Sequence, residues 1–116
     1  MEHNDYTYNA RVVRVIDGDT VVVNIDLGLD VWKHDQHLRL RGIDAAEVRT
    51  RDAVEKAAGL EAKAFLKTLL PPGEPVVVTT FKDRTTFGRY VADVALAGAD
   101  IGAIMVEKGL ATVHRY

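Results

Sequence analysis

The order of extended and helical segments is the feature of this chain that most limits how it can fold. Alternating or Val- and Ile-rich patterns predict strands over Tyr8–Ile16, Thr20–Leu27 and His37–Gly42. Between the last two strands, residues 28–36 have the composition of a polar loop, which contains Trp32. In His37–Gly42 the leucines alternate with His37, Arg39 and Arg41, so Arg39 and Arg41 are expected on one face and the leucines on the other.

The second half of the chain begins with a helical pattern. A stripe of Ala58, Ala62, Phe65 and Leu69 predicts a helix from Asp52 to Leu70, and Pro71-Pro72-Gly73 ends it. Gly59 costs about 1 kcal/mol relative to alanine in a helix, so the firm part is expected to begin near it. The remaining segments are two strands, a capped helix and a final extended piece, namely Pro75–Phe81, Tyr90–Leu96, Asp100–Lys108 and Ala111–His114.

The succession of three strands, a helix, two strands and a helix is the layout of an OB-fold barrel. We therefore expect a mainly β fold of the α+β class, with a five-stranded barrel and two helices. A length of 116 residues favours a single domain, 1–116, with residues 1–8 as a flexible N-terminal segment. A hydrophobic content of 47% argues against a disordered chain.

Composition excludes some chemistries and leaves others open. The chain has no cysteine, which excludes disulfides and thiolate metal sites. Its formal net charge of -2 does not indicate the basic face that nucleic-acid-binding proteins usually carry. A cluster of acids that binds a cation would also lower the total charge, so the net charge does not exclude nucleic-acid binding. The segment Met1–Asn9 has no apolar run typical of a signal peptide, so the default expectation is a cytoplasmic protein with no membrane partner. Secretion stays open as the alternative if a leader has been removed.

Acidic and basic side chains concentrate near predicted strand ends. Arg39, Asp44 and Glu47 follow one another from a strand into a loop, Asp17-Gly18-Asp19-Thr20 lies upstream, and Phe87-Gly88-Arg89 lies downstream. Carboxylates can hold a hard cation, and guanidinium groups can bind two phosphate oxygens at a time. A further carboxylate can orient or deprotonate water. Together these are the groups needed for metal-assisted cleavage of a phosphodiester.

At these three motifs, in this order and at these separations, the chain resembles the staphylococcal nuclease-like (thermonuclease) family. The resemblance runs from about Val12 to Val113 and implies the same barrel. It implies that Asp19, Asp44 and the backbone carbonyl of Ala45 are Ca²⁺ ligands. The family usually has Thr-Pro at Ala45-Ala46, and a carbonyl ligand survives that change, although the loop loses the restraint of proline.

The resemblance also implies the catalytic and substrate-binding residues. Glu47 matches the glutamate that positions the attacking water, and Arg39 and Arg89 match two phosphate-binding arginines. Phe87 stands where the family often has a nucleotide-contacting tyrosine, and it keeps the aromatic face without the hydroxyl. Thr86 replaces a basic residue. Family members usually carry a third helix beyond the point where this chain ends, so a minimal version or one domain of a larger product is expected.

Other polar residues have two interpretations each. Asp17 can cap the turn or join the acidic cluster. Arg41 could bind substrate near Arg39, although a structural or peripheral role is favoured.

His34 and His37, with Asp30 and Asp35, could suggest a transition-metal site, but a solvated loop is favoured.

The combined expectation is a Ca²⁺-dependent nuclease that hydrolyses DNA, with RNA as a further candidate, at low sequence specificity. The resemblance implies 3′-phosphate products, and no obligate protein partner is evident. The alternative is a non-catalytic OB-fold module that binds nucleic acid or protein.

Overall fold

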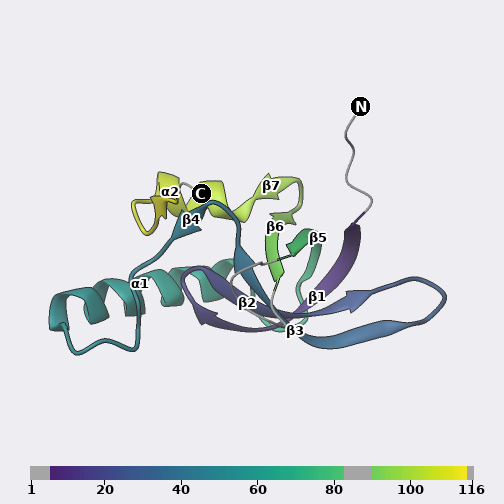
Figure 1. The fold of residues 1–116 in the computed structure, drawn as a ribbon, viewed down its shortest axis with the longest axis horizontal. Coiled ribbons are helices and arrows are strands. Elements are labelled where there is room, and N and C mark those ends of the chain that lie inside the picture. Colours follow the sequence, from purple (N-terminus) through teal and green to yellow (C-terminus); the bar gives the residue numbers. More distant parts are fainter. Residues whose placement is uncertain (1–5, 83–89, 115–116) are drawn as a thin grey trace.

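A computed structural model describes residues 6–82 and 90–114, and within these ranges the chain forms eight strands and two helices (Figure 1). The elements follow in the order β1 (Thr7–Asp17), β2 (Thr20–Asp26), β3 (Trp32–Leu40), β4 (Ile43–Asp44), α1 (Ala53–Leu69), β5 (Pro75–Lys82), β6 (Tyr90–Leu96), β7 (Ala99–Asp100), α2 (Ile101–Glu107) and β8 (Thr112–Val113). Neither helix is long and apolar enough to cross a membrane.

Five of the strands close into a barrel. The sheet order is β3-β2-β1-β5-β6-β7, and a parallel pairing of β3 with β6 joins the two sides. All other neighbours in this sheet are antiparallel. The order of strands and helices confirms the predicted mainly β OB-fold with two helices. Residues 1–8 were expected to form a flexible segment, but β1 begins at Thr7, so Thr7 and Tyr8 belong to the sheet.

The core fills the barrel and the face that α1 covers. Leu38 and Leu40 on β3 are fully buried, as the alternating pattern predicts, together with Val21 and Val23 on β2. Leu66 on α1 is equally buried, and α1 packs mainly against β1 among the strands. Because side chains alternate along β3, burial of the leucines leaves Arg39 on the outer face of the barrel.

The β2–β3 hairpin is longer than the sequence predicts. Residues 32–36 were expected in a loop, but they belong to β3, where Asp26 pairs with Trp32 and Val23 pairs with Gln36. The backbone N–H of Leu27 donates to the carbonyl of Val31 across the turn, at 2.8 Å. In Figure 1 this hairpin projects to the right of the view, whereas α1 lies on the left. Residues 32–35 are exposed, so backbone pairing forms the strand without an alternating apolar pattern.

The third predicted strand is interrupted before its end. β3 stops at Leu40, and Gly42 adopts a φ of 78°, which turns the chain into β4. β4 leaves the barrel sheet and pairs with β8, with Ile43 opposite Val113. Asp44 therefore lies on a separate two-residue strand and not at the end of the third strand.

Helix α1 begins well before the glycine that was expected to delay it. Asp52 caps the helix because its carboxylate accepts from the backbone N–H groups of Val54 and Glu55, at 2.9 and 3.2 Å. The predicted span is confirmed, but the buried face is rotated. Ala58 is exposed, and the buried residues are Gly59, Ala62 and Leu66.

Gly59 lies where α1 contacts the loop after β4. A Cβ atom at this position would lie 2.6 Å from the carbonyl oxygen of Glu47 and 2.9 Å from that of Ala46. Both atoms belong to the backbone and cannot rotate away. The glycine therefore lets the helix pack directly against the loop that carries Glu47.

We predict that Gly59→Ala destabilises the protein by about 1–2 kcal/mol, because the clash outweighs the roughly 1 kcal/mol gain in helix propensity. Ala57→Gly, at an exposed position of the same helix, is the matched control and should cost about 1 kcal/mol from propensity alone. Urea unfolding followed by circular dichroism measures both. A Gly59→Ala variant more stable than the wild type would show that the close approach does not constrain the helix.

Candidate active site

A polar cavity of about 450 Å³ opens where the β1–β2 turn, β3 and the loop after β4 meet. Its lining combines acidic, arginine and small residues: Asp17, Asp19, Thr20, Arg39, Asp44, Ala45, Ala46, Glu47, Arg49 and Glu55. Five predicted site residues, Asp19, Arg39, Asp44, Ala45 and Glu47, are thus brought together around one cavity.

Asp19 is the buried carboxylate of this site, with a relative exposure of 7%. Its Oδ1 accepts from the hydroxyl of Thr20, and its Oδ2 accepts from the backbone N–H of Ala45, both at 3.0 Å. The second bond ties the β1–β2 turn to the loop after β4. A buried carboxylate needs such donors because desolvation otherwise makes its charge costly.

Arg39 connects the two predicted metal-ligand carboxylates. Its register opposite Thr20 places it beside the β1–β2 turn. Its Nη2 lies 3.6 Å from Oδ2 of Asp19 and is paired with Oδ1 of Asp44. The same nitrogen donates to the carbonyl of Ile43, at 3.1 Å. A guanidinium has five N–H donors, so others remain to bind a phosphate.

Asp44 has a second partner from the end of the described chain. Nδ1 of His114 lies 2.6 Å from Oδ2 of Asp44, on the oxygen that Arg39 does not contact. No sequence motif indicated a role for His114. Its contact with Asp44 spans 70 residues of sequence and arises from the pairing of β4 with β8.

The loop from Ala45 to Glu47 is packed from two sides. Gly18 lies so close to it that an added Cβ would be 2.9 Å from the Cβ of Ala45, and Gly59 of α1 contacts the other side. The Glu47 side chain is exposed at the cavity and makes no hydrogen bond or ion pair within residues 6–82 and 90–114. Its backbone is thus held while its carboxylate remains available.

The charges of the cavity favour a cation. Among the described residues that line it, five are acidic and two are arginines. No three His, Asp or Glu side chains in the described ranges form a ready metal cluster. The available donors are the carboxylates of Asp19 and Asp44, backbone carbonyls and solvent. An all-oxygen set of this kind fits a hard divalent cation that keeps open coordination positions.

Of the three further residues predicted for this cavity, only Arg41 lies within the described residues. Arg41 is absent from its lining; it pairs with Asp93 at 3.3 Å, and its Cζ lies 4.3 Å from the ring centroid of Phe81. Phe87 and Arg89 lie outside the described residues. Their predicted roles in stacking and phosphate binding remain predictions.

Arg49 is a cavity residue that sequence reasoning missed. Its side chain is exposed, and it makes no hydrogen bond or ion pair with the described part of the chain. Its position two residues after Glu47, in the same loop, was the available signal. Glu55 was also missed, because its position in the first turn of α1 resembles an ordinary helix-start acid.

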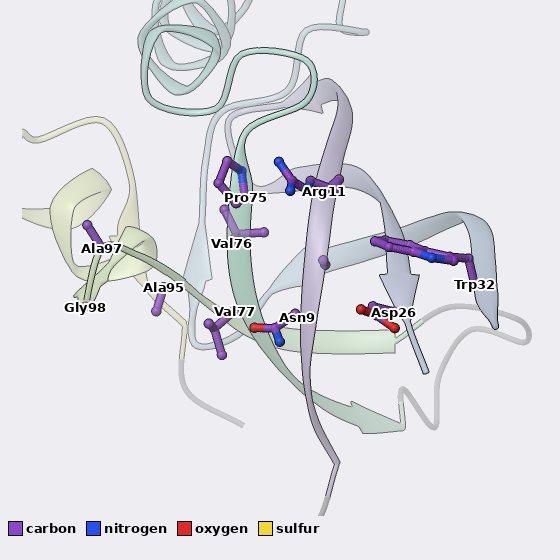
Figure 2. A pocket seen from close by; sticks show the side chains of 11 residues that line it. Asn9, Arg11, Asp26, Trp32, Pro75, Val76, Val77, Ala95, Ala97 and Gly98 are labelled. Carbon is purple, nitrogen blue, oxygen red and sulfur yellow. The ribbon is translucent and has the colours of Figure 1, made fainter. Parts of the chain in front are cut away.

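A second cavity, which shares no lining residue with the first, lies beside Trp32 (Figure 2). Asn9 and Arg11 from β1, Asp26 from β2 and Pro75 from β5 line it with Trp32. Trp32 is 39% exposed at the start of β3. Trp32 therefore lines a different cavity from the acidic cluster.

Comparison with known proteins agrees with the geometry. The family model described as "Staphylococcal nuclease homologue" matches residues 37–116. The chain is similar to the thermonuclease of Staphylococcus hyicus, with 30% identity over 113 residues, which is 97% of this chain and 62% of that protein. The chain thus spans less than two thirds of the length of this relative. On the family match and the shared barrel, the chain belongs to the staphylococcal nuclease family.

Proposed function

We propose that this protein hydrolyses phosphodiester bonds of DNA, with RNA as a further substrate, at the cavity formed by Asp19, Arg39, Asp44 and Glu47. The main support is the arrangement of Arg39 between two carboxylates, with the carboxylate of Glu47, which has no partner among residues 6–82 and 90–114, at the same cavity. The activity of the relative from Staphylococcus hyicus, named a thermonuclease, is consistent with it.

Arg39 would bind the scissile phosphate. Its planar fork matches two phosphoryl oxygens, and it would stabilise the negative charge that increases on them in the transition state. The contacts of Nη2 with Ile43 and Asp44 restrain the guanidinium beside the cavity. Arg89 is proposed as the second arginine on the same phosphate, from its match to the family motif.

Glu47 would orient the attacking water and accept its proton. The packing of its backbone against Gly59 holds the loop, and the exposed carboxylate can reach a water in the cavity. Positioning and proton transfer together typically contribute 10²–10⁴-fold. Water then attacks phosphorus in line with the leaving oxygen, and the resemblance to the family implies 3′-phosphate products.

We propose Ca²⁺ as the cation, held by Asp19, Asp44 and the carbonyl of Ala45. When bound, such a cation polarises a phosphoryl oxygen and lowers the pKa of a coordinated water. Ca²⁺ accepts six to eight oxygen ligands in loose geometry, whereas Mg²⁺ requires near-octahedral order. A site with two carboxylates, beside a loop without the family's proline, suits the more tolerant ion.

Specificity for sequence should be low. The side chains around the cavity are charged or small, and they suit contacts with the phosphodiester backbone. The proposed stacking residue, Phe87, would accept any base because every base has a π face.

The proposal predicts cleavage of plasmid and single-stranded DNA with Ca²⁺, at least tenfold slower cleavage with Mg²⁺, and none in excess chelator. A gel assay with each metal and with chelator measures this. Undiminished cleavage in chelator would exclude a metal-dependent mechanism. Tight binding of single strands without cleavage under any metal would favour the alternative, a non-catalytic binding module.

Glu47→Gln should lower the single-turnover cleavage rate by roughly 10²–10⁴, because glutamine keeps the size of the side chain but cannot accept the proton. Nucleotide affinity should change little, since the arginines and the cation still hold the phosphate.

Glu55→Gln is the matched control, because Glu55 lines the same cavity but accepts a hydrogen bond from the hydroxyl of Thr50, at 3.2 Å. It should change the rate by no more than a few-fold. Equal losses in both variants would indicate a general effect of cavity charge and would remove Glu47 from its assigned role.

A further inference from the structure

The last described strand, β8, lies directly against the strand that carries Asp44. In the antiparallel β4–β8 pair, Asp44 is opposite Thr112 and Ile43 is opposite Val113. The backbone N–H of His114 continues the pairing by donating to the carbonyl of Gly42, at 2.8 Å. The register of β8 is therefore defined on both sides of Asp44.

This register brings the imidazole of His114 to the Asp44 carboxylate. Thr112 faces Asp44 across the pair, and His114, two residues further, projects from the same face as a diagonal neighbour. Its Nδ1 lies 2.6 Å from Oδ2 of Asp44. An ionised carboxylate can only accept hydrogen bonds, so we assign the proton of this contact to Nδ1.

The two metal-ligand carboxylates are held in different ways. Asp19 is fixed by its neighbour Thr20 and by the backbone of Ala45. Asp44 is more exposed, with 43% of its side chain accessible, and its two oxygens contact Arg39 of β3 and His114, which follows β8. Without His114, only Arg39 would define the rotation of that carboxylate in the described structure.

We propose that His114 is a positioning residue that orients Asp44 for the divalent cation, an inference that rests on the proposed function. Solvent-accessible ion pairs contribute little to stability, so the contact has little value for the fold alone. Each carboxylate oxygen has two lone-pair directions, so Oδ2 can accept from His114 while the carboxylate coordinates a cation. Partners of this kind typically change metal affinity by 10–100-fold when removed.

Asparagine and glutamine at position 114 separate this role from a general one. The side-chain amide nitrogen of asparagine occupies nearly the place of Nδ1, whereas that of glutamine lies nearer the place of Nε2. We expect His114→Asn to keep the Ca²⁺ dissociation constant within about threefold of the wild type. His114→Gln and His114→Ala should raise it by about 10–100-fold.

The measurement is calorimetric titration of the full chain with Ca²⁺ alone, after thermal unfolding by circular dichroism has shown that each variant is folded. Val113→Ala is the matched control, because Val113 is the preceding residue and is 63% exposed. It should bind Ca²⁺ as the wild type does.

Unchanged affinity in His114→Gln and His114→Ala would overturn the inference, as would an equal loss in His114→Asn. If the wild type itself does not bind Ca²⁺, the proposed function fails first, so the two failures are distinguishable. A second readout needs no His114 variant. The ¹⁵N resonances of the His114 ring should show a protonated Nδ1 and should shift in Asp44→Asn, and identical spectra would contradict the contact.

Discussion

The ion pairs of Arg39 are the interactions on which the candidate site depends. Two carboxylates that face one cavity repel each other unless positive charge lies between them. Arg39 supplies that charge by contacting both Asp19 and Asp44. It can do so because Leu38 and Leu40 are buried on either side of it, which fixes the outer face of β3, and because it pairs with Thr20 next to Asp19. The packing of the barrel therefore determines the position of the charged groups.

A second constraint acts on the loop that follows. The backbone N–H of Ala45 donates to Asp19, while Gly18 and Gly59 allow the β1–β2 turn and α1 to approach the loop closely. These contacts hold the backbone on both sides and leave the Glu47 carboxylate exposed at the cavity. Packing thus restrains a loop that contains Ala45-Ala46 and no proline. An ordered backbone with an available side chain is what a water-positioning residue requires.

The barrel and its two helices could be predicted from the sequence, because burial on one face of a strand or helix leaves a period in the sequence. The convergence of five candidate site residues could be predicted because the motifs are spaced as in a known family. Prediction failed where structure arises without a local pattern. Trp32 to Gln36 form a strand through backbone pairing, with exposed side chains at residues 32–35. The pairing of β4 with β8 involves two residues on each side, too few to show alternation. The contact of His114 with Asp44 depends on that distant register, so no local signal could reveal it.

We propose that Arg39 acts on phosphate as a planar fork and not only as a positive charge. Arg39→Lys keeps the charge and removes the fork. Single-turnover cleavage of DNA with Ca²⁺ should fall by roughly 10²–10³, the usual effect of losing one transition-state donor. Arg11→Lys, an exposed arginine outside the cavity on β1, should retain the wild-type rate. A folded Arg39→Lys variant that cleaves as fast as the wild type would contradict the account.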